Sequence, residues 1–155
     1  MQIHDLSREE CAGVLRAADV AHLACARRGE PYVVPIHFSF DAEQDCVYGV
    51  SAIGQKVEWM RANPRVCLAV EHVSDKNHWK TVVITGTYQE LRNEADADDA
   101  QRRCLRLFEK RKEWWLPAMA AKLGQDYHGV VLFRIRIDRM TGRAAARDQT
   151  IPPVM

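Results

Sequence analysis

Six short stretches of this sequence have the residue pattern of β-strands, and most follow one another without a helix between them. In the clearest, 32–40, the apolar residues Val34, Ile36, Phe38 and Phe40 fall on one face of an extended chain. The other predicted strands cover residues 20–27, 46–50, 66–70, 81–91 and 130–137. Strands and helices do not alternate regularly, so the order disfavours a parallel doubly wound sheet. It favours a mainly β fold with inserted helices, in which the six strands form an antiparallel barrel.

Helices are predicted in the longer connections between these strands. Ser7 and Glu10 form an S-x-x-E capping box, which begins a helix. A second helix, with Ile53 on its apolar side, is expected to end at Asn63-Pro64, because the residue before a proline avoids helical geometry. A third is expected over residues 96–111 and a short fourth over 114–124.

The remaining connections are predicted to be polar turns. Residues 73–78 have the composition of a solvent-exposed loop, and Thr141-Gly142 is expected to turn into a tail of about 144–155. Pro35 cannot donate a hydrogen bond to a neighbouring strand, so its strand is expected at a sheet edge or bulge. We expect one domain over residues 1–155.

Composition narrows the possible partners. The 22 Lys and Arg against 21 Asp and Glu give a net charge of +1, so no bulk field recruits nucleic acid or an anionic membrane. The five cysteines are odd in number and form no C-x-x-C pair, as in a chain with reduced, structural thiols. No apolar run is long enough to span a bilayer, and the first residues are too polar for a signal peptide, so a cytoplasmic location is expected.

The segment from Tyr48 to Lys56 is the most informative candidate for a ligand site. A strand runs into the small-residue turn Ser51-Ala-Ile-Gly54 and then into a helix whose first turn carries a lysine. Free N–H groups and the helix dipole attract anions, and Lys56 adds a full positive charge. An ordinary capped structural turn would have the same sequence, so both interpretations stay open.

Two other clusters carry weaker signals. His72 and His78 flank Asp75 and have the side chains of metal ligands, but without a cysteine partner a solvated loop is favoured and no metal site is predicted. The basic residues between Arg102 and Lys112 follow acidic residues at the start of the same helix, the distribution that a helix dipole favours.

Several motifs in order resemble those of the pyridoxamine 5′-phosphate oxidase-like FMN-binding split barrels. These are a strand followed by SAIGQK, then NP, an apolar strand and WKTVVITG, over about residues 5–143. The order is similar to that of the branch with nitroimidazole-resistance reductases and small flavin-nucleotide-binding proteins. Many members of that branch have His-Ser where this chain has Val50-Ser51, which weakens the expectation of that branch's reaction.

The resemblance implies a six-stranded split β-barrel that dimerises with FMN at the interface. Lys56 would hold the FMN phosphate beside Ser51 and Gln55, and the flavin ring would lie along the strand of Pro35. Trp79, Trp114 and Trp115 are expected to be covered in the dimer. The implied cofactor-binding residues are Pro35, Ile36, His37, Val50, Ser51, Gln55, Lys56, Lys80 and Thr81.

The leading interpretation is an FMN-dependent oxidoreductase acting on a small organic substrate. His37 is the candidate catalytic residue, because it is the best titratable side chain near the implied ring position. Two alternatives stay open: a non-catalytic flavin-binding or sensing barrel, and the same fold with F420 or haem. Haem would need an axial histidine, for which His37, His72 and His78 are the choices.

Overall fold

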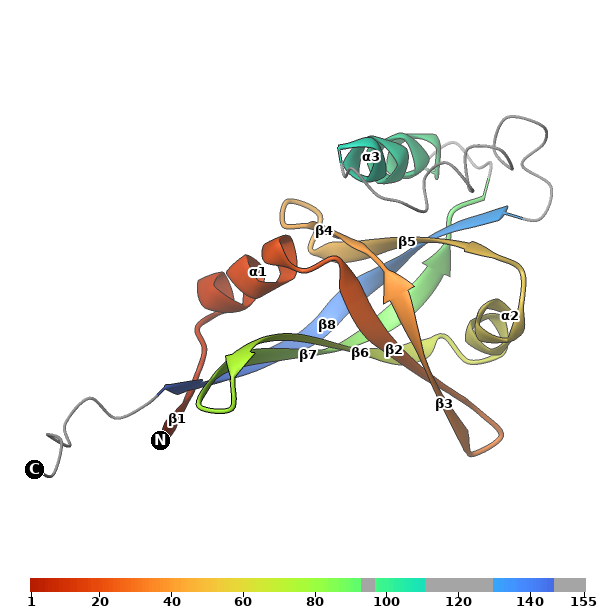
Figure 1. Ribbon diagram of the computed structural model, residues 1–155. Helices are drawn as coiled ribbons and strands as arrows, with labels where there is room; N and C mark the ends of the chain where they lie inside the picture. Colours follow the sequence, from red (N-terminus) through yellow and green to blue (C-terminus); the bar gives the residue numbers. More distant parts are fainter. Residues whose placement is uncertain (93–96, 111–129, 147–155) are drawn as a thin grey trace, which may run out of the picture.

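The computed structural model describes residues 1–92, 97–110 and 130–146. Most of these residues belong to eight strands, and three helices connect some of them (Figure 1). In chain order the elements are β1 (Gln2–Asp5), α1 (Arg8–Ala17), β2 (Val20–Arg27), β3 (Glu30–His37), β4 (Ser39–Asp41), β5 (Cys46–Ala52), α2 (Gln55–Ala62), β6 (Arg65–Asp75), β7 (His78–Glu90), α3 (Ala97–Glu109) and β8 (Val130–Ala146).

The strands form one antiparallel sheet in the order β3-β2-β6-β7-β8-β5-β4, and β1 pairs with the far end of β8. The hydrogen-bonded ladder ends at β3 and at β4 rather than closing. A register shift between Thr85 and Gly86 bends β7 against β8. The prediction of a mainly β, antiparallel split barrel is confirmed, whereas the described strands number eight rather than six.

Alternating side chains fill the concave side of the sheet. Leu23, Leu68, Ile84 and Ile135 are almost completely buried there, and α1 and α2 pack against the same core. Helix α3 lies over the other side of β5 and β8 (Figure 1). A second cluster of buried side chains, which includes Tyr48, Cys104 and Phe108, packs there. The strong amphipathic spacing expected near 96–111 therefore gives a helix that covers the outside of the barrel.

The predicted capping box is confirmed. The N–H of Glu10 donates to the Ser7 hydroxyl at 3.2 Å, and the Glu10 carboxylate accepts from the Ser7 N–H at 2.7 Å. These two bonds lower the pKa of Glu10 below its usual value. The second helix begins later than expected, at Gln55, so Ile53 lies outside it and is 49% exposed.

Several loop predictions were wrong for identifiable reasons. The polar stretch 73–78 is the end of a long β6–β7 hairpin that extends into solvent, which explains its composition. Thr141-Gly142 is no turn, because β8 passes through it to Ala146. A Cβ on Gly142 would collide with the Cys11 sulfur and the Leu6 side chain, so this glycine marks the close approach of α1.

Two of the eight strands were not predicted separately: β1 was missed, and β4 was merged with β3. All four residues of β1 are exposed, so no hydrophobic alternation marks it. The predicted strand 32–40 is divided at Phe38, whose N–H donates to the Asp19 carbonyl at 3.3 Å. The helix predicted over 114–124, with Trp114 and Trp115, and the last residues of the predicted tail lie outside the described residues.

Candidate functional site

The turn between β5 and α2 presents backbone donors beside a lysine. Gly54 is the N-cap of α2, and no side chain caps it. The first N–H groups of the helix thus lack a side-chain acceptor. Lys56 lies in this first turn, is half-buried, and pairs with no carboxylate of the described residues. Gln55 beside it is exposed. The turn can accept an anionic group.

Two predicted members of this turn are occupied by local contacts. Ser51 is 6% exposed, and its hydroxyl donates to the Ala52 carbonyl at 2.8 Å. The side chain of Val50 packs against the cluster under α3. At these two positions the backbone is therefore better placed than the side chain to meet a ligand.

Helix α2 is held firmly against the barrel. Asn63 donates from its amide to the Ala26 carbonyl at 3.0 Å, and the Tyr32 and Trp59 rings pack with centroids 5.7 Å apart. Arg61 binds both oxygens of the Glu90 carboxylate, at 2.8 and 2.6 Å. This pair holds the pKa of Glu90 below its usual value. The direction of the first turn of α2 is thereby fixed.

Pro35, Ile36 and His37 lie together on β3, at the edge of the sheet. The prediction that Pro35 belongs to an edge strand is confirmed. Ile36 points into the core and is 8% exposed, whereas Pro35 is exposed and His37 half-buried on the outer face. Because β3 pairs only with β2, half of its backbone groups are directed away from the sheet. Such an edge can pair with a planar ligand.

A single chain does not bring Lys80 and Thr81 to the same place as Lys56. Ser51 is opposite Val131 on β8, and Lys80 is opposite Ala144. Thirteen residues of β8 separate those two partners, roughly 40 Å along a strand. Figure 1 shows α2 at one end of the barrel and the tip of the β6–β7 hairpin at the other.

Lys80 and Thr81 also leave opposite faces of β7. Thr81 shares the outer face with Val83, while Lys80 lines a cavity of about 350 Å³ with Glu10, His72 and Trp79. The positive charge of Lys80 contributes to lowering the pKa of Glu10. Trp79 is half-buried in one chain.

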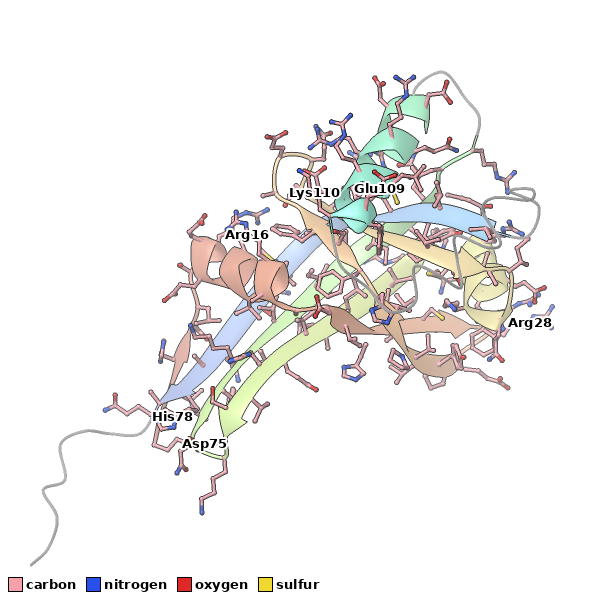
Figure 2. The ribbon with its side chains drawn as sticks, turned by 45° about the horizontal axis from the view of Figure 1, so that its top comes forward. Arg16, Arg28, Asp75, His78, Glu109 and Lys110 are labelled. Atoms are coloured by element: carbon pink, nitrogen blue, oxygen red, sulfur yellow. The ribbon has the colours of Figure 1, made fainter. Side chains whose placement is uncertain are left out.

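The histidines of the hairpin do not form a metal cluster. His78 contacts the Asp75 carboxylate at 2.8 Å, and Figure 2 shows the two side by side at the hairpin tip. Within residues 1–92, 97–110 and 130–146, no group of three or more histidine, cysteine, aspartate or glutamate side chains is placed to hold a metal ion. No described helix is both long and apolar enough to cross a membrane.

The outer face of β3, β2, β6 and β7 exposes apolar side chains that the sequence reasoning did not single out. Val20, Val33, Val73 and Val83 are 43%, 62%, 61% and 46% exposed. Each lies an even number of residues from a position that faces away from the core, so the four valines share one side of the sheet. The alternation was visible in the sequence, but only the strand order places these valines on one face with His37 and Thr81.

The fold defines a split β-barrel of the kind that the motifs indicated. The family model described as pyridoxamine 5′-phosphate oxidase matches residues 7–144. The chain therefore belongs to this family, and the resemblance inferred from the motifs is confirmed.

Individual proteins agree with this assignment. An uncharacterized protein of Rhizobium meliloti (strain 1021) is 39% identical over 148 residues, which are 94% of this chain and 97% of that protein. The crystal structure of an FAD-binding protein from Mesorhizobium loti is 36% identical, with a TM-score of 0.76, covering 94% of this chain and 100% of that one. A candidate 5-nitroimidazole antibiotic resistance protein from Bacteroides thetaiotaomicron is 19% identical, with a TM-score of 0.69 over 92% of this chain and 87% of its own, and supports the fold alone.

Proposed function

We propose that the chain binds FMN between two copies of itself and works as a flavin-dependent oxidoreductase on a small organic substrate. The membership of the family and the relative named an FAD-binding protein, 36% identical, support a flavin cofactor. The observation that carries the proposal is the uncapped first turn of α2 with Lys56 in it. FMN supplies the redox chemistry when bound, and the protein positions it.

The β5–α2 turn suits the phosphate of FMN. This phosphate is a dianion, and charge-assisted bonds from an ammonium and backbone N–H groups are the strong contacts for it. Lys56, half-buried and without a carboxylate partner in the described part of the chain, would supply the cation. Gln55 and the backbone of Val50 and Ser51 would line the same turn.

The edge of β3 would carry the flavin ring. Backbone groups directed away from β2 can hydrogen-bond to the polar edge of a planar ring, and Pro35 leaves a gap in the donors. His37 would lie beside the ring as the candidate catalytic residue. Ile36 would contribute through its backbone, since its side chain is in the core.

The second copy would complete the site. Exposed apolar side chains on a sheet face commonly mark interfaces, and four exposed valines lie on the outer face that also carries His37 and Thr81. Lys56 and the pair Lys80-Thr81 are too far apart in one chain to hold the same cofactor. We therefore assign Lys80 and Thr81 to the partner's contribution, and expect the larger effect from Thr81, which is on the outer face.

FAD is the second candidate cofactor, favoured by the name of the Mesorhizobium loti relative. Equilibrium titration of the apo-protein with FMN, FAD and riboflavin tests both. We expect FMN to bind most tightly, because only its terminal phosphate is a free dianion. Equal affinity for FMN and riboflavin would contradict phosphate binding by the β5–α2 turn. Tighter binding of FAD than of FMN would favour FAD as the cofactor.

A separate measurement distinguishes an enzyme from a flavin-storing or sensing barrel. Anaerobic addition of NADH or NADPH should bleach the bound flavin if the protein catalyses electron transfer. Persistent flavin colour with both donors would favour the non-catalytic barrel. The absorbance spectrum of the purified protein separates flavin from F420 and from haem, which has a Soret band.

A further inference from the structure

A second polar cavity lies under α3, on the side of the barrel covered by that helix. It has a volume of about 450 Å³ and opens between α3, the β4–β5 turn and β8. Four arginines line it, Arg102, Arg103 and Arg106 from α3 and Arg134 from β8. Cavities of a few hundred Å³ fit small molecules. None of the nine residues proposed for the flavin site lines this cavity.

Two of the guanidinium groups are held in place by the protein. Arg103 donates from Nε and Nη2 to the Asp41 carboxylate at 2.8 and 2.9 Å, and from Nη2 to Glu43 at 3.1 Å. Arg134 donates from Nε to the Gln89 side chain at 2.8 Å. Within residues 1–92, 97–110 and 130–146, the hydrogen bond of the Arg134 guanidinium uses only Nε. The cavity thus has preorganised donors.

The carboxylates around the cavity do not neutralise it. Asp41 and Glu43 are both engaged with Arg103, and Asp99 is 3.9 Å from Arg102. Arg106 and Arg134 have no carboxylate partner among the residues that the structure describes. Four arginines and three carboxylates therefore leave an excess of one positive charge at the cavity among the described residues, and that excess favours an anion.

Tyr48 adds a buried hydroxyl at the same place. The residue is 0% exposed, lines the cavity, and its hydroxyl has no hydrogen-bond partner among the described residues. The thiol of Cys46 is its near neighbour, and a thiol is a weak partner. Burial raises the pKa of Tyr48 above its usual value, so the hydroxyl stays protonated and can donate. A buried donor without a strong acceptor is costly, and an anion oxygen would satisfy the Tyr48 hydroxyl if the side chain turned toward the cavity.

We propose that this cavity is a second ligand site, which binds the phosphate group of a small phosphorylated molecule. Guanidinium groups recognise phosphate oxygens in pairs with matching geometry, and Arg106 and Arg134 are the two arginines of the cavity with no carboxylate contact among the described residues. The site is distinct from the one proposed for FMN. Its ligand is a substrate or effector that binds independently of the cofactor's phosphate.

The test is calorimetric titration of the FMN-loaded protein with inorganic phosphate, glycerol 3-phosphate and glycerol. Both phosphates should bind and glycerol should not. Arg106→Gln removes an exposed arginine that contacts no carboxylate in the described part of the chain, and it should weaken binding about tenfold, the scale of one charge-assisted bond. Arg16→Gln removes the same charge from α1 and should leave the affinity unchanged.

Tyr48→Phe gives an independent readout. Without phosphate the variant should be as thermally stable as the parent protein or more so, because an unpaired buried hydroxyl is gone. Its stabilisation by phosphate should be smaller than that of the parent. Lys56→Met, which disables the site proposed for FMN, should retain phosphate binding, so failure of one proposal can be told from failure of the other.

Three outcomes would overturn the inference. The first is no binding of either phosphate at millimolar concentration. The second is equal loss of affinity in Arg106→Gln and Arg16→Gln, which would indicate a general charge effect. The third is a tenfold loss of FMN affinity in Arg106→Gln, which would make the cavity part of the flavin site.

Discussion

Replacing Lys56 by methionine should separate the affinity for FMN from the stability of the fold. Methionine keeps the length and helix propensity of the side chain and removes only the charge. A charge-assisted hydrogen bond to a phosphate is worth about 1.5–3 kcal/mol, which predicts about a 10- to 150-fold loss of FMN affinity. Riboflavin has no phosphate, so its affinity should change little.

The same substitution should slightly stabilise the apo-protein. Lys56 lies in the first turn of α2, at the positive end of the helix dipole, and no carboxylate of the described residues offsets it. Removing a cation there should raise the free energy of unfolding by about 0.3–1 kcal/mol. A loss of affinity combined with a gain in stability is the signature of a ligand-binding lysine.

The assay is fluorescence titration with both flavins, together with urea denaturation of the apo-protein. Lys76→Met is the matched control, because Lys76 is exposed in the β6–β7 turn and belongs to neither proposed site. An FMN affinity that stays within twofold of the parent's would refute the reasoning. Equal losses for FMN and riboflavin would show damage to the whole pocket instead.

Three predictions concern the stability of the barrel, measured by urea denaturation. Asp41→Asn should cost about 1.5–3 kcal/mol, because a carboxylate 4% exposed loses its charge-assisted bonds to Arg103, and a cost below 0.5 kcal/mol would argue against this pair. The pKa values of Asp41 and Glu90 are lower in the folded than in the unfolded chain, so as pH falls the unfolded chain binds protons before the folded chain does. Stability should therefore fall as pH drops below about 4.5 and should not fall between pH 5 and 7. Gly49→Ala should cost about 1–3 kcal/mol, because its methyl would meet the buried Phe133 ring, and an unchanged midpoint would mean that the ring can move.

The sequence was sufficient to predict the strands with strong alternation and the helix with a capping box. Pro35 predicted the edge position of its strand correctly, because a proline cannot donate a hydrogen bond to a neighbouring strand, and this can be read from the residue alone. Gly142 was misleading for a physical reason. A glycine in a turn and a glycine under a packed helix look alike in one sequence, and only the contact with Cys11 distinguishes them.

The candidate site was less predictable, because it depends on how distant segments meet. Lys56 was identified from its own neighbours, since a strand, a small-residue turn and a helix are local features. The separation of Lys56 from Lys80 follows from the register of β5 and β7 on β8, which local patterns do not contain. The cavity under α3 was missed because Arg134 is far in sequence from the basic helix that it faces.

The mass of the FMN-loaded protein in solution tests the central claim most directly. Two chains of 17.7 kDa sharing their cofactors by C2 symmetry should give about 35 kDa by light scattering at micromolar concentration, with one FMN per chain by absorbance. A particle of 17.7 kDa that still holds FMN would contradict a site completed by a second copy.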